Sequence, residues 1–102
     1  MIRMYRCDNG ELICELQAHS RQINGLVCHP SRSVFATAGE DTFMNVWEVA
    51  GSKIDSLEIN LVASTRCPDF LLTGLAFGGN NNTSIVASVY DYKSVLVWDS
   101  AL

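Results

Sequence analysis

The chain has 102 residues, of which 48% are hydrophobic and 18% charged, and its formal net charge is −4. This length and composition predict one small globular domain. Seven Lys and Arg without a basic run argue against nucleic-acid binding, and no apolar run approaches the roughly 20 residues of a membrane-spanning helix. Because the N-terminus lacks a signal-peptide pattern, we expect a cytoplasmic protein whose four cysteines are reduced and mostly buried.

The predicted secondary structure is a succession of short strands. Asn9-Gly10 is typical of a tight hairpin turn, and Pro30 ends a strand because proline cannot donate a ladder hydrogen bond. No segment has a clear helical period, and several strands are apolar on both faces, which indicates an all-β protein with stacked sheets. The predicted strands are residues 2–6, 12–16, 23–28, 34–38, 43–49, 54–62, 71–77, 85–90 and 94–99, with residues 63–69 as a connector.

The chain also repeats itself. Trp47 and Trp98 are 51 residues apart (98 − 47), and the segment 23–28 matches the segment 72–77 at an offset of 49 (72 − 23). A period of about 40–50 residues with four strands per unit is typical of β-propellers, in which sheets called blades are arranged around an axis.

Short motifs accompany this period. They are Ala18-His19, His29-Pro30, residues 36–41 ending in Gly-Glu-Asp, Val46-Trp47-Glu48 and Val97-Trp98-Asp99. Together these motifs resemble the WD-repeat family, and the resemblance extends over nearly the whole chain. In that family one sequence repeat supplies the outer strand d of one blade and then strands a, b and c of the next.

The resemblance implies a partial β-propeller. Residues 1–102 would form a single propeller segment, in which residues 11–49 are a first complete d-a-b-c repeat and residues 54–100 a second, degenerate one. Residues 2–6 would be strand c of an earlier blade. Two such repeats and one leading strand cannot close a ring. We therefore expect either the C-terminal segment of a longer propeller or a chain that associates with itself.

The resemblance also implies a structural hydrogen-bond network in the first repeat. His19, Thr37, Asp41 and Trp47 match its positions. A turn aspartate can hold a histidine, which reaches a hydroxyl group, which in turn accepts the indole N–H. Each buried polar group then has a partner, as burial requires.

The second repeat departs from this pattern. Trp98 is kept, and Ser88 is expected to take the place of the hydroxyl residue. The histidine position falls on Pro68 and the aspartate position on Tyr92, while Asp91 lies one residue early. We therefore expect no complete network in the second repeat.

Catalytic and metal sites are not predicted. Cys28 and His29 are adjacent in the sequence, so their side chains point to opposite faces and are badly placed to share a proton. We expect Cys28 to be buried at a strand end and His29 to be a turn residue. The histidines and cysteines lack the spacing of metal ligands, and no cofactor motif is present.

The function implied by the resemblance is a non-catalytic scaffold that binds other proteins, an inference by analogy with the fold. The expected partner contacts lie in the loops beside the network and are Ser20, Arg21, Gln22 and Glu40. Two alternatives stay open. One is a small-ligand-binding or enzymatic propeller whose site lies on other blades, and the second is a stand-alone β-sandwich recognition domain.

Overall fold

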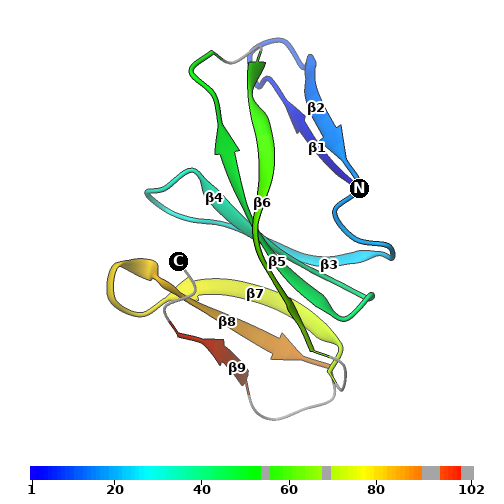
Figure 1. The fold of residues 1–102 in the computed structure, drawn as a ribbon, viewed down its shortest axis with the longest axis vertical. Coiled ribbons are helices and arrows are strands. Elements are labelled where there is room, and N and C mark those ends of the chain that lie inside the picture. Colours follow the sequence, from blue (N-terminus) through cyan, green and yellow to red (C-terminus); the bar gives the residue numbers. More distant parts are fainter. Residues whose placement is uncertain (54–55, 68–69, 91–94, 100–102) are drawn as a thin grey trace.

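A computed structural model describes residues 1–53, 56–67, 70–90 and 95–99. The predicted all-β class is confirmed, because antiparallel strands account for nearly all of the regular structure (Figure 1). The strands are β1 (Ile2–Tyr5), β2 (Leu12–Leu16), β3 (Ile23–Cys28), β4 (Val34–Gly39), β5 (Phe43–Ala50), β6 (Glu58–Arg66), β7 (Leu72–Gly78), β8 (Ser84–Val89) and β9 (Val95–Trp98). A short 3-10 helix, η2 (Asn80–Asn82), lies between β7 and β8.

The strands form three separate sheets. The first sheet pairs β1 with β2, the middle sheet has the order β3-β4-β5-β6, and the third has the order β7-β8-β9. Every pairing joins strands that are consecutive in the chain. The middle sheet lies between the other two (Figure 1). Three unclosed antiparallel sheets in this arrangement are consistent with part of a propeller.

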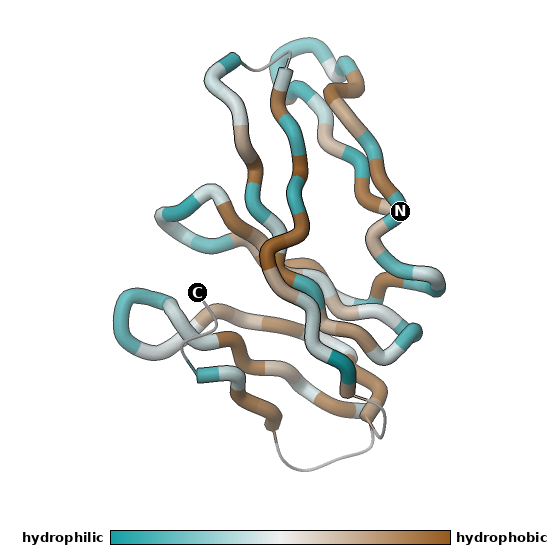
Figure 2. The backbone as a smooth tube through the Cα atoms, in the orientation of Figure 1, coloured by the Kyte–Doolittle hydropathy of each residue, from teal (hydrophilic) through white to brown (hydrophobic). Residues whose placement is uncertain are grey.

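The central strands β4 and β5 of the middle sheet are buried on both faces, between which their side chains alternate. On one face, Phe35 and Trp47 pack against residues of the first sheet and of the segment before β3. On the other face, Ala36 and Val46 pack in a cluster with residues of the third sheet. The strands β7 and β8 are hydrophobic along much of their length (Figure 2), as a sheet packed against another requires.

The sixth strand differs from its prediction. β6 spans Glu58–Arg66 rather than residues 54–62, so most of the expected connector at 63–69 is strand. It pairs with the whole of β5, from Ala50 opposite Glu58 to Phe43 opposite Arg66. An outer strand exposes most of its side chains, and its polar C-terminal half therefore lacks the apolar alternation on which the prediction relied.

The cysteines were also predicted wrongly in part. Cys7 and Cys28 are exposed and Cys14 is half-buried, so only Cys67 is buried. Burial raises the pKa of the Cys67 thiol. No helix among the residues described is long and apolar enough to cross a membrane.

Candidate interaction site

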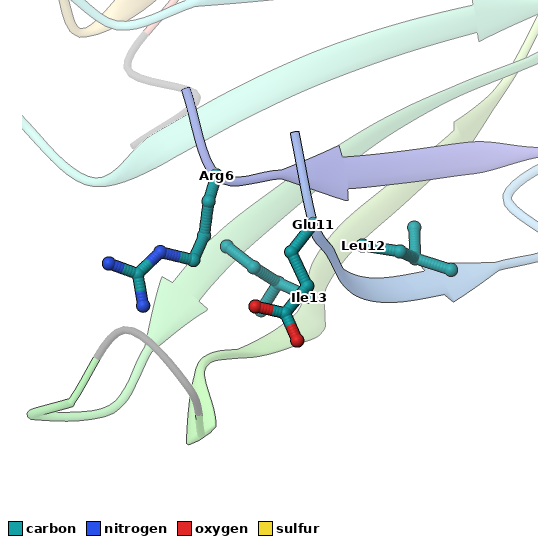
Figure 3. Close-up of a pocket in the computed structure, with 4 residues that line it drawn as sticks. All are labelled: Arg6, Glu11, Leu12 and Ile13. Atoms are coloured by element: carbon teal, nitrogen blue, oxygen red, sulfur yellow. The ribbon is translucent and has the colours of Figure 1, made fainter. Parts of the chain in front are cut away.

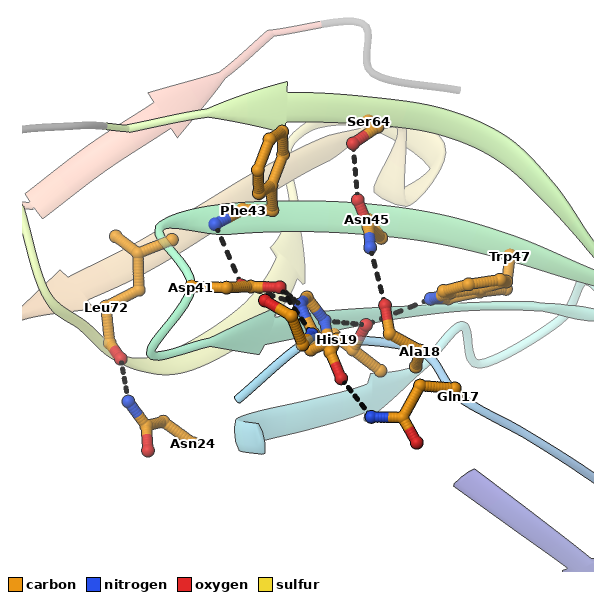
Figure 4. Close-up of polar contacts among 12 residues, drawn as sticks. Gln17, Ala18, His19, Asn24, Asp41, Phe43, Asn45, Trp47, Ser64 and Leu72 are labelled. Carbon is orange, nitrogen blue, oxygen red and sulfur yellow. Dashed lines mark hydrogen bonds and ion pairs between the residues drawn. The ribbon is translucent and has the colours of Figure 1, made fainter. Parts of the chain in front are cut away.

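The turn between β4 and β5 is organised by one carboxylate. Asp41 faces Nδ1 of His19, with distances of 2.9 Å to Oδ1 and 3.1 Å to Oδ2 (Figure 4). It also accepts hydrogen bonds from the backbone N–H groups of Ser20, at 3.1 Å, and Phe43, at 3.2 Å. The carboxylate therefore joins the segment between β2 and β3 to the β4–β5 turn.

From His19 the hydrogen bonds continue into the interior. Nε2 of His19 lies 2.7 Å from Oγ1 of Thr37, and the indole N–H of Trp47 donates to the same oxygen at 2.9 Å (Figure 4). With a proton on Nδ1 facing the carboxylate, Nε2 accepts the hydroxyl proton of Thr37, whose oxygen accepts from the indole. The structure thus places His19, Thr37, Asp41 and Trp47 in one chain of hydrogen bonds.

Burial and hydrogen bonding act in opposite directions on Asp41. Partial burial favours the neutral acid, whereas the hydrogen bonds from His19 and from the N–H groups of Phe43 and Ser20 favour the carboxylate. The hydrogen bonds prevail, and the pKa of Asp41 lies below its ordinary value near 3.8. The residue is therefore ionised at neutral pH and can hold its donors.

Sequence reasoning missed two members of this site. Asn45 is buried, donates through its side-chain amide to the carbonyl of Ala18 at 3.2 Å, and accepts from Oγ of Ser64 at 2.6 Å. Gln17 donates from its side chain to the carbonyl of His19 at 2.6 Å. The signal for Asn45 was an amide between the apolar residues Met44 and Val46, which burial tolerates only with partners.

The expected contact residues lie around the network. Ser20, Arg21, Gln22 and Glu40 are all exposed. The backbone N–H of Glu40 donates to the carbonyl of Gln22 at 2.8 Å, which adds a second tie between the two loops. The backbones of these loops are therefore fixed while the four side chains face solvent.

The third sheet has no equivalent polar chain in its described part. Trp47 pairs with Phe35 in the middle sheet, and Trp98 pairs with Ile85 in the third. Thr37 lies two residues after Phe35 in β4. The residue two positions after Ile85 in β8 is Ala87, so Ala87 and not Ser88 corresponds to Thr37. The prediction for Ser88 was therefore wrong.

The cause is a slip of one residue in the repeat. The offset is 51 for Trp98 against Trp47 (98 − 47) but 50 for the strand that precedes it (85 − 35). Ser88 consequently points to the opposite face, where it is exposed and shares a hydrogen bond of 2.9 Å with the hydroxyl of Thr73. Pro68, Asp91 and Tyr92 lie outside the described residues.

The predicted burial of Cys28 is wrong, and His29 lies in the β3–β4 turn. Cys28 is exposed, and His29 is 7% exposed. Both ring nitrogens of His29 are occupied by backbone groups, so the ring has no free nitrogen that could serve as a base for the thiol. Within the described ranges, no group of three or more His, Cys, Asp or Glu could hold a metal ion.

A pocket also lies beside the β1–β2 turn. Arg6, Glu11, Leu12 and Ile13 line it (Figure 3). The guanidinium of Arg6 is paired with Asp8 at 2.7 Å, and this bond lowers the pKa of that carboxyl group. The Arg6 guanidinium in the lining is thus engaged within the β1–β2 hairpin.

Comparison with known proteins shows a likeness to one family. Residues 10–48 match the family model "WD domain, G-beta repeat". The match covers the network from His19 to Trp47 as well as β2 to β4 and most of β5. The chain therefore carries a WD40 repeat and resembles WD-repeat proteins.

Particular relatives extend this likeness to nearly the whole chain. "WD repeat domain 54" of Rattus norvegicus is 26% identical over 100 residues, which are 97% of this chain and 30% of the relative. "WD repeat-containing protein 54" of Mus musculus is 26% identical over 96 residues, or 93% of this chain and 29% of the relative. "p21-activated protein kinase-interacting protein 1" of Mus musculus is 31% identical over 55 residues, 52% of this chain and 14% of the relative. The chain thus spans less than a third of the length of these proteins.

Proposed function

We propose that this chain is a non-catalytic part of a WD-repeat scaffold and that it binds another protein through the loops held by Asp41. WD-repeat proteins generally act as scaffolds for protein interactions. One of the relatives is named for its interaction with a protein kinase. For this chain we propose no particular partner.

One observation carries the proposal: a single carboxylate fixes two loops whose side chains remain exposed. Asp41 binds His19 and the N–H of Ser20 from one loop and the N–H of Phe43 from the other. Loops that are already ordered lose little conformational entropy on binding, and pre-organisation of this kind favours affinity. Arg21 and Glu40 then supply a cation and an anion on loops whose backbones are held, which favours specificity.

The same proposal includes the boundaries of the repeats. We infer that residues 11–49 and 54–100 are successive d-a-b-c units of a C-terminal propeller segment in a cytoplasmic protein. In support, β2 pairs with the strand that precedes it in the chain, and β6 likewise pairs with β5 rather than with β7. Each proposed unit thus begins with the outer strand of one sheet and continues with the next sheet, as the family pattern requires.

The test compares two charged pairs on the same chain. The double variant Arg21→Ala and Glu40→Ala removes both charges beside the network, whereas Arg32→Ala and Glu48→Ala removes one cation and one anion from exposed positions elsewhere. Each protein is used for affinity capture from a lysate, and the captured proteins are quantified against wild type. We expect selective loss of partners with the first variant and retention with the second. Equal capture by all three proteins would contradict the proposed face.

A further inference from the structure

The middle and third sheets meet along a seam between β3 and β7. The two backbones approach closely at its centre, where a Cβ on Gly25 would lie 3.3 Å from Cα of Gly74. Toward the start of β3, the side-chain amide of Asn24 donates to the carbonyl of Leu72 at 3.1 Å. Just beyond the end of β3, His29 reaches the η2 turn. We call the contact of His29 with that turn the histidine clasp.

The bonds of His29 determine where its proton lies. Nε2 is 3.1 Å from the carbonyl oxygen of Asn82, which can only accept, so Nε2 carries the hydrogen. Nδ1 is 3.1 Å from the backbone nitrogen of Ser31 and 3.0 Å from that of Arg32, and both of these N–H groups donate to it. Nδ1 must therefore be the unprotonated nitrogen of a neutral imidazole.

The described surroundings of the ring are an aromatic side chain and an uncharged turn. The ring packs edge-on against Phe77 of β7, with centroids 5.0 Å apart and planes at 66°. The η2 turn contributes only uncharged asparagine residues, and its Asn81 and Asn82 adopt φ values of 58° and 53°. The nearest charge along the chain is the cation of Arg32, and among the described residues no Asp or Glu forms a hydrogen bond or ion pair with His29.

We propose that the histidine clasp is a proton-sensitive link between the middle and third sheets. Charging the ring places a second N–H on Nδ1, directly opposite the N–H groups of Ser31 and Arg32. Two hydrogen bonds are then lost and three donors face one another, so the turn after β3 opens and releases the η2 turn. The β3–β4 and β7–β8 turns lie together at the left of Figure 1, away from the loops held by Asp41.

The second histidine of the chain provides an internal contrast. Nδ1 of His19 faces the carboxylate of Asp41, which accepts a hydrogen bond from the N–H of either a neutral or a charged ring. Acidification in the range where histidine ordinarily changes charge therefore preserves the bond between His19 and Asp41. The two histidines should respond differently although both are buried.

Amide hydrogen exchange on the 102-residue chain tests the clasp. Rates are measured at about pH 7.5 and about pH 5.5, on either side of the histidine range, and corrected for intrinsic exchange. We expect the protection of the Ser31 and Arg32 amides to fall about tenfold on acidification, as loss of an acceptor implies. The amides of Ser20 and Phe43, which donate to Asp41, should keep theirs. Constant protection at Ser31 and Arg32, or an equal fall at all four amides, would overturn the proposal.

A variant and a spectrum make the test specific. Asparagine can accept from N–H groups two and three residues ahead through its side-chain oxygen and does not ionise, so His29→Asn should abolish the pH response of both amides. Persistence of that response would overturn the proposal. In the wild-type chain, ¹⁵N-resolved spectra of the imidazole should show hydrogen on Nε2 and none on Nδ1 at about pH 7.5. The opposite tautomer would refute the clasp whether or not the variant folds.

Discussion

The middle and third sheets both pair their antiparallel strands in chain order, but the residues at corresponding positions differ in polarity. In the middle sheet, Thr37 is paired with Asn45, and both residues have buried polar groups with partners. In the third sheet the corresponding pair is Ala87 and Leu96, which have apolar side chains. Directional hydrogen bonds thus fix the loops of the first repeat, whereas that part of the third sheet relies on packing. A buried network specifies geometry in a way that apolar contacts do not.

The largest expected effect comes from filling the space beside the network. A Cβ on Gly39 would lie 2.6 Å from Nδ1 of His19 and 2.7 Å from Oδ1 of Asp41. Gly39→Ala therefore forces these groups apart, and we expect it to lower the free energy of unfolding by about 3 kcal/mol, measured by urea denaturation.

Gly78→Ala in β7 is the matched control. Its Cβ would meet only Cγ2 of Val86, at an ordinary contact distance of 3.8 Å. We expect a change of less than about 1 kcal/mol, since alanine costs a strand no more than glycine does. Equal losses for Gly39→Ala and Gly78→Ala would contradict the special position of Gly39.

An intermediate effect is expected from removing the central hydroxyl. Thr37→Val keeps the shape of the side chain but leaves the indole N–H of Trp47 without an acceptor and Nε2 of His19 without a donor. An unsatisfied buried group is costly, so we expect a loss of about 2 kcal/mol in the free energy of unfolding. In the third sheet, Ala87→Val adds no polar mismatch, and its effect should depend only on packing. A neutral Thr37→Val would show that the network contributes little to stability.

The smallest expected effect is the pH dependence of the free energy of unfolding that arises from Asp41. Partial burial would raise the pKa of Asp41, but the hydrogen bonds lower it below 3.8, so the carboxylate stabilises the fold above that pH. This contribution is lost as the pH falls through the lowered pKa. Asp41→Asn should therefore reduce the free energy of unfolding at neutral pH and differ less from wild type in strong acid. A difference that does not depend on pH would contradict this role of the charge.

Much of the first repeat was predictable from the sequence because local signals agreed there. Strand alternation and the Gly39-Glu40-Asp41 turn predicted the β4–β5 hairpin, and the order of His19, Thr37 and Trp47 pointed to their hydrogen-bonded chain. The position of β6 was not predictable in the same way. Its C-terminal half is polar, and its extent is set by pairing with β5 rather than by its own pattern.

Two other features that the sequence did not reveal have tertiary causes. A slip of one residue between neighbouring strands moved Ser88 to the opposite face, and a pattern counted only along the chain does not reveal such a slip. The burial of His29 depends on Phe77 and on the carbonyl of Asn82, which is 53 residues away. Neither contact leaves a local signal in the sequence around His29.

The most direct test of the difference between the two sheets uses the two tryptophans of the chain. The indole N–H of Trp47 is buried and bonded to Thr37, whereas that of Trp98 has no hydrogen-bond partner among the described residues. Both indole signals can be followed in one hydrogen-exchange experiment on the wild-type chain. We predict slow exchange for Trp47 and exchange at least about tenfold faster for Trp98, as one buried hydrogen bond implies. Equal protection of the two indoles would contradict the account.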